Sequence, residues 1–140
     1  MSKRWVTIKP HSTHRKPQTM PRAHLDESQI HPAVRAVVAK HEHGIVQEVQ
    51  AAIAQHPVVV VGMGMNPFPK KARKALDAAG QPYHYMEYGH YFNNWRPRTA
   101  LKMWCGWPSF PMVFVKGQLV GGANDLIKLM DKGELKTLLA

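Results

Sequence analysis

PVVVVGMGMNPFPKKARKAL, residues 57–76, carries the strongest structural signal in the chain. Four consecutive β-branched valines, Val58 to Val61, predict a short strand that is buried on both faces and therefore central in a sheet. Asn66 is suited to cap a helix, and Pro67 fits its first position, where a missing N–H is harmless. The stretch therefore predicts a strand, a loop over residues 62–65 and a helix over residues 67–79.

The remaining segments alternate between helical and strand patterns. Apolar spacing predicts a helix from Ser28 that Gly44 interrupts, and a second helix that ends before Pro57. Farther along, we expect a strand over 82–87, a helix over 98–104, a hairpin with strands 112–115 and 118–120, and a last helix over 125–130 capped by Asn124. On the helix over 67–79, the inner side is expected to hold Phe68, Ala72, Ala75, Leu76 and Ala79.

Composition and charge bound the function classes. The chain has 140 residues and a formal charge of +10, and residues 1–25 contribute +6 with no acidic residue. This basic arm predicts either a solvated terminus or a contact with nucleic acid, an acidic protein or a membrane surface. No apolar run approaches the roughly 20 residues that cross a bilayer, so we expect no membrane partner. The single Cys105 excludes an intramolecular disulfide, and a cytoplasmic location is the simplest expectation.

Several patterns suggest metal or nucleotide chemistry and fall short of it. His41-Glu42-His43 has i,i+2 spacing, whereas ligands on one helix face need i,i+3 or i,i+4 spacing. Gly62-Met63-Gly64 lacks the third glycine of a dinucleotide fingerprint, because Pro67 stands there. The thioethers of Met63 and Met65 are soft ligands that suit Cu(I) only with a further ligand such as His90. We therefore assign no metal site.

Two segments near the predicted helix over 67–79 leave alternatives open. Lys70, Lys71, Arg73 and Lys74 crowd its first two turns, as either a solvated face or a positive collar that suits an anionic group. Residues 88–95, Tyr-Gly-His-Tyr-Phe-Asn-Asn-Trp, form an aromatic, polar loop of a kind that favours recognition surfaces.

The back half of the chain carries a long, ordered motif. Trp107-Pro108-Ser109-Phe110-Pro111 is followed by the segment 115–122, Val-Lys-Gly-Gln-Leu-Val-Gly-Gly, and later by Gly133-Glu134-Leu135. With the order β-α-β-α-β-β-α, this pattern resembles the glutaredoxins, and most closely their monothiol branch. The resemblance implies an α/β, thioredoxin-like (glutaredoxin) fold, with a four-stranded mixed sheet flanked by helices, over residues 45–140. Residues 1–27 are then a basic arm, and residues 28–44 an extra N-terminal helix.

The resemblance also implies a glutathione groove. The family has a cis peptide bond before the equivalent of Pro111, and it uses Ser109 and Phe110 to pair with the backbone of a thiol peptide. Arg98 matches a basic residue that meets the glycine carboxylate, and Gly122, Ala123 and Asn124 lie where the glutamyl end is held. Asn124 replaces the family aspartate, which weakens the expected contact with an ammonium group.

The active-site loop departs from the family. Asn66-Pro67-Phe68-Pro69 stands where relatives have a motif that begins with cysteine, and Met63 stands where they have a lysine. Disulfide exchange requires a thiolate, and the same cysteine would ligate a bridging [2Fe–2S] cluster in monothiol relatives. Neither Asn66 nor Pro69 supplies a thiol, so we assign no catalytic residue.

The sequence thus predicts a non-redox binding or adaptor protein that keeps a glutathione-type groove. The groove or the aromatic loop would hold a partner, which we expect to be another protein, with glutathione as the one small ligand implied. Two alternatives stay open: a glutathione-dependent thiol-disulfide oxidoreductase that uses Cys105, and an iron–sulfur or metal-handling protein with Cys105, Met or His ligands. Cys105 follows the helix over 98–104, and we expect it to be a buried, structural cysteine.

Overall fold

The computed structural model describes residues 21–140, which belong to two compact units, 1–35 and 36–140. The first 20 residues of the predicted basic arm, with His11 and His14, lie outside the described residues. In the part of the chain that is described, no helix combines the length and the apolarity that a membrane span needs.

The helix predicted from Ser28 is divided in two. A short 3₁₀ helix, Glu27–Gln29, is capped by the Asp26 carboxylate, which accepts a hydrogen bond from the Ser28 N–H and has its pKa lowered by Ser28. Helix α1, Pro32–Lys40, begins after a break at Ile30, whose backbone is extended. His31 also lies outside both helices, because a proline disfavours helical geometry in the residue before it.

Helix α2, His43–Gln55, includes Gly44, which was predicted to end the helix from Ser28. The chain instead changes direction at Glu42, whose φ of 47° lies in the left-handed region. Gly44 is exposed and meets no neighbouring atom, so it continues the helix at the modest entropic cost that glycine carries there. Val49 and Ala52 of α2 are buried.

The sheet has four strands in the order β2-β1-β3-β4. These are β1 (Val58–Gly62), β2 (His84–Glu87), β3 (Met112–Val115) and β4 (Gln118–Gly121). Strand β1 pairs in parallel with β2 and antiparallel with β3, and β3 and β4 form the predicted hairpin. The mixed sheet with a central β1 confirms the predicted fold class.

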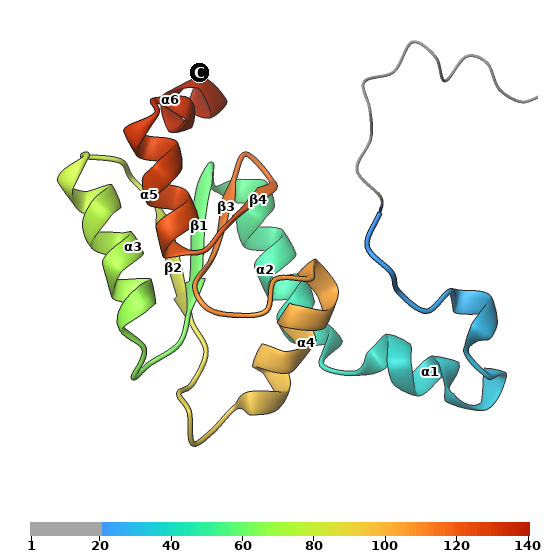
Figure 1. Cartoon of the computed structure of the whole chain (residues 1–140). Helices are drawn as coiled ribbons and strands as arrows, with labels where there is room; N and C mark the ends of the chain where they lie inside the picture. Colours follow the sequence, from blue (N-terminus) through green and yellow to red (C-terminus); the bar gives the residue numbers. More distant parts are fainter. Residues whose placement is uncertain (1–20) are drawn as a thin grey trace, which may run out of the picture. The chain divides into compact units, whose positions relative to one another are not determined.

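Helices cover both faces of the sheet, as Figure 1 shows. Val59 and Val61 face the core layer that contains residues of α2 and of α4 (Trp95–Cys105). Val58 and Val60 face the opposite layer, which contains residues of α3 (Pro67–Ala78), α5 (Ala123–Asp131) and α6 (Glu134–Leu139). All four valines are 0% exposed, because alternate side chains of one strand enter opposite cores.

Three predicted helix details are wrong. Phe68 is 48% exposed and Ala79 is also exposed, so neither belongs to the inner side of α3. Ala72 and Leu76 are buried there as predicted, together with Pro69. Helix α4 begins three residues before Arg98, at Trp95. Helix α5 begins at Ala123, so Asn124 lies inside it and does not cap it. The cap is Gly122, whose N–H donates to Asp125 Oδ2 at 3.0 Å.

A matched pair of valine substitutions tests the burial of β1. Val60→Ala removes two methyl groups from a fully buried side chain, and we expect the free energy of unfolding to fall by about 2 kcal/mol. Val37→Ala removes the same groups from a side chain of α1 that is 67% exposed, and we expect a change of less than about 0.5 kcal/mol. Urea denaturation measures both values, and equal effects would contradict the central position of β1.

Candidate functional site

A pocket of about 430 Å³ lies where α3, α5 and the segment before β3 meet. We call it the α3–α5 pocket. Its wall is formed by Asn66, Pro67, Phe68, Tyr91, Trp107, Ser109, Phe110, Pro111, Gly122, Ala123, Asn124 and Asp125. The pocket thus joins the loop that follows the central strand β1 to the segment that leads into its neighbour β3.

The structure brings six of the seven predicted groove residues to this one pocket. Ser109, Phe110 and Pro111 come from the segment before β3, and Gly122, Ala123 and Asn124 come from the start of α5. The peptide bond between Phe110 and Pro111 is cis. The predicted active-site loop divides between two environments. Its first three residues, Asn66, Pro67 and Phe68, line the pocket, whereas Pro69 is buried on the inner side of α3.

Arg98, the seventh predicted groove residue, lies elsewhere. Its side chain is only 7% exposed, and its Nη1 donates to the carbonyl oxygens of Asn93 at 2.6 Å and Tyr88 at 3.1 Å. A guanidinium group has several donors in one plane, which suits it to gather backbone carbonyls in this way. The structure therefore corrects the predicted position of Arg98, because this residue is not part of the pocket wall.

Asn66 joins two walls of the pocket through its side chain. Its Oδ1 accepts a hydrogen bond from the Phe68 N–H at 2.9 Å, which confirms the predicted helix cap. Its Nδ2 donates to the Phe110 carbonyl oxygen at 3.3 Å, across 44 residues of sequence. Asn66 thus holds the start of α3 to the segment before β3.

The pocket wall carries groups that suit an anionic ligand and one that opposes it, the Asp125 carboxylate, whose Oδ2 accepts a hydrogen bond from the Gly122 N–H. The N-terminus of α5 presents backbone N–H groups and the positive end of the helix dipole at Ala123 and Asn124. Lys71 adds a cation at the rim, because its Nζ donates to Asn124 Oδ1 at 2.8 Å. The indole Nε1 of Trp107 is buried and has no hydrogen-bond partner among the described residues.

The basic side chains of α3 do not form one collar. Lys71 reaches the pocket rim, whereas the Arg73 guanidinium lies 4.1 Å from the centre of the Tyr85 ring, over the sheet. Burial, together with a hydrogen bond to Glu87, raises the pKa of Tyr85 to about 12, so its hydroxyl stays protonated at neutral pH. Neither alternative describes the whole cluster. Lys71 lies at the pocket rim, as a collar would require, whereas Arg73 packs on an aromatic ring.

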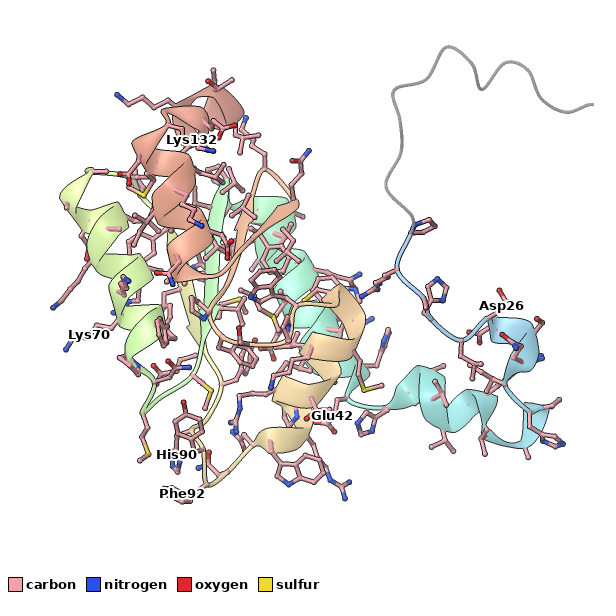
Figure 2. The ribbon with its side chains drawn as sticks, viewed as in Figure 1. Asp26, Glu42, Lys70, His90, Phe92 and Lys132 are labelled. Carbon is pink, nitrogen blue, oxygen red and sulfur yellow. The ribbon has the colours of Figure 1, made fainter. Side chains whose placement is uncertain are left out.

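The aromatic loop, residues 88–95, is held by hydrogen bonds within itself and exposes the rings of Tyr91, Phe92 and Trp95. The ring of Tyr88 packs against the core instead. The His90 N–H donates to Asn93 Oδ1 at 2.9 Å, and the Phe92 N–H donates to His90 Nδ1 at 3.1 Å. The exposed fraction is 59% for Tyr91, 82% for Phe92 and 60% for Trp95. Figure 2 shows His90 and Phe92 together at the tip of the loop, and Tyr91 also lines the pocket.

Gly89 permits this loop geometry. Its φ is +61°, and a Cβ at this position would lie 2.5 Å from Asn93 Oδ1 and 3.0 Å from Arg98 Nη1. Only glycine fits both the left-handed backbone and the close approach of these two side chains. Gly89, Asn93 and Arg98 therefore form one packed support under the exposed rings.

The sulfur-containing side chains lie away from the pocket wall. Cys105 is half-buried at the C-terminal end of α4, where its Sγ lies 3.5 Å from Met112 Sδ and accepts a hydrogen bond from the Trp107 N–H. Met63 packs in the core, whereas Met65 is 63% exposed, so these neighbours in sequence occupy different environments. Within residues 21–140, no group of three His, Cys, Asp or Glu side chains could hold a metal ion.

Three pocket residues were not predicted from the sequence. Trp107 opens the motif that carries the family resemblance, and Asp125 follows Gly122 by the three residues that a capping pair requires. These two signals could have identified both residues. Tyr91 has no such signal, because the irregular backbone of the aromatic loop decides which of its rings turns toward the pocket.

Substitution of Arg98 tests the support under the aromatic loop. We expect Arg98→Met to lower the free energy of unfolding by about 2 kcal/mol, because two carbonyl groups lose a charged donor. Amide hydrogen exchange at His90 and Asn93 should become faster at the same time. Arg96→Met, at an exposed neighbour, is the matched control and should change neither quantity. Unchanged exchange in Arg98→Met would contradict this account of the loop.

The chain is similar in sequence to known glutaredoxins. No protein-family model matches it. A glutaredoxin-like protein of Dictyostelium discoideum is 41% identical over 98 residues, which cover 70% of this chain and 80% of the relative. Glutaredoxin 4 of Escherichia coli (strain K12) is 30% identical over 99 residues, which cover 67% of this chain and 84% of the relative.

Solved structures of glutaredoxins share the fold of this chain. Oxidised glutaredoxin 2 from Chlamydomonas reinhardtii has a TM-score of 0.60 and 29% identity, with 70% of this chain and 92% of that chain covered. A buckwheat glutaredoxin–glutathione complex has a TM-score of 0.63 and 23% identity, with 71% of this chain and 91% of that chain covered.

Proposed function

The chain belongs to the glutaredoxin family, and on that premise we propose that it is a non-redox binding protein whose α3–α5 pocket holds glutathione or a related thiol peptide. One observation carries the proposal. Six residues expected to form a glutathione groove line a single pocket, and the residue beside them at the helix start is Asn66, which has no thiol. The buckwheat glutaredoxin of the same fold, which forms a complex with glutathione, adds support.

Glutathione would be held mainly at its glutamyl end, because its glycine end lacks the expected partner. A carboxylate suits the N-terminus of α5, where Ala123 and Asn124 present N–H groups and Lys71 adds a positive charge. The middle of a peptide suits the backbone of Ser109 and Phe110. Arg98 is engaged under the aromatic loop, so the glycine carboxylate lacks its expected partner. We therefore expect weak binding, with a dissociation constant of about 1 mM, or roughly −4 kcal/mol.

The position of Cys105 favours binding over disulfide exchange. Exchange needs a thiolate, and a thiolate is stabilised by a helix N-terminus or a nearby positive charge. Cys105 instead lies at the C-terminal end of α4, the negative end of the helix dipole, and does not line the pocket. Both features argue against the alternative in which Cys105 takes over the redox chemistry.

The aromatic loop offers a second contact surface, and we propose that it holds another protein. Exposed Tyr and Trp rings on an ordered backbone are typical anchors of protein interfaces, because little conformational entropy is lost when they are buried. Contact between the basic arm and nucleic acid stays a prediction, since residues 1–20 lie outside the described part of the chain.

Isothermal titration with glutathione tests the pocket. We expect saturable heat with a dissociation constant of about 1 mM for the unmodified protein. Ser109→Glu places a carboxylate on the exposed surface of the pocket wall and should weaken binding at least about tenfold, which corresponds to roughly 1.4 kcal/mol. Ala54→Glu, on the exposed side of α2, is the matched control and should bind like the unmodified protein. No heat at about 10 mM glutathione would refute the proposal.

Restoring a thiol at position 66 gives an independent test. In a Cys105→Ser background, Asn66→Cys places a thiol at the N-terminus of α3, where its thiolate is stabilised. With oxidised glutathione, this thiolate should attack one sulfur, form a protein–glutathione disulfide and release the other glutathione as a thiolate. Intact-mass spectrometry detects the adduct, and adding Ser109→Glu should slow its formation. Glutathione-dependent disulfide reduction by the unmodified protein, lost on Cys105→Ser, would instead favour the redox alternative.

A further inference from the structure

We propose that the Asn66 side chain is a latch on the pocket: it occupies the Phe110 carbonyl, and a ligand binds by replacing the Asn66 amide with an amide N–H of its own. The inference rests on the proposed function and names the class of ligand that the pocket takes. That class is an extended, peptide-like molecule with an internal amide, whether or not its sulfur is free.

Two hydrogen bonds fix the direction of the Asn66 amide. Oδ1 faces the Phe68 N–H at 2.9 Å, and Nδ2 faces the Phe110 carbonyl at 3.3 Å. Turning the amide over would place two donors together at Phe68 and two acceptors together at Phe110. The donor of Asn66 is therefore held toward Phe110 as long as α3 is capped.

The Phe110 carbonyl lies outside the sheet ladder. The pairing of β3 with β1 begins at Met112, two residues later, so Phe110 has no place in that register. Phe110 is only 4% exposed, and a carbonyl with so little access to water requires a hydrogen-bond donor. Asn66 supplies this donor from the opposite wall of the pocket.

The latch sets what can bind. A ligand that presents only anionic oxygens is drawn to the N-terminus of α5, but it has no donor to offer the Phe110 carbonyl and leaves the latch closed. A peptide amide replaces the lost hydrogen bond and can lie between α3 and the segment before β3. No protein sulfur takes part, so S-methylglutathione should bind as well as glutathione.

The test compares the unmodified protein with Asn66→Ser by isothermal titration of S-methylglutathione. Serine keeps a side-chain cap on α3, but its side chain is too short to hold Phe110 as well. We expect Asn66→Ser to bind about fivefold more tightly, the factor that corresponds to one hydrogen bond of about 1 kcal/mol. Asn66→Ala, which also removes the cap, should show the same gain at lower stability. Gln47→Ser, on the exposed side of α2 and outside the pocket wall, is the control and should bind like the unmodified protein.

A second readout follows the latch itself. In the unmodified protein, the NMR signals of the Asn66 side-chain amide should shift as S-methylglutathione is added, since Nδ2 leaves the Phe110 carbonyl. Equal or weaker binding by Asn66→Ser overturns the latch and leaves the proposed function standing. Binding by Asn66→Ser alone refutes the proposed function of the unmodified protein and supports the latch, and binding by neither protein overturns both.

Discussion

The burial of strand β1 on both faces is the constraint from which the rest of the structure follows. Its four valines enter two separate cores, so helices must cover each side of the sheet. A strand enclosed in this way has little freedom to shift, because a slip of one residue would exchange the two cores. The loop after β1 therefore delivers the start of α3 to a fixed place beside the segment before β3, and the pocket forms there.

The parts of the fold that depend on local chemistry could be predicted from the sequence. The valine run, the cap at Asn66 and the turn at Lys116-Gly117 each specify their own geometry, and the structure contains all three. The parts set by distant contacts could not. Arg98 was predicted to meet a ligand carboxylate in the groove, but the fold brings two backbone carbonyl groups to it. Asn124 has a side chain that suits a helix cap, but α5 begins one residue before it. The hydrogen bond from the Gly122 N–H to Asp125 makes Gly122 the cap.

The asparagine at the start of α3 limits what this helix end can do chemically. A thiolate there would be a nucleophile whose charge is stabilised by the helix. An amide is neutral, bonds in two directions at once and attacks nothing. The pocket around Asn66 keeps the positive end of α5 and the backbone of Ser109 and Phe110. Under the proposed function, a ligand occupies this site reversibly, with no covalent step between ligand and protein.

The support under the aromatic loop has a consequence for how this protein can vary in evolution. Gly89, Asn93 and Arg98 fit against one another so closely that a change at any one leaves the other two without space or partners. A substitution at one of these positions would need a compensating change at the others, whereas the exposed rings of Tyr91 and Phe92 can change without disturbing this support. New binding preferences can therefore arise at the tip of the loop by single mutations, while its backbone stays the same.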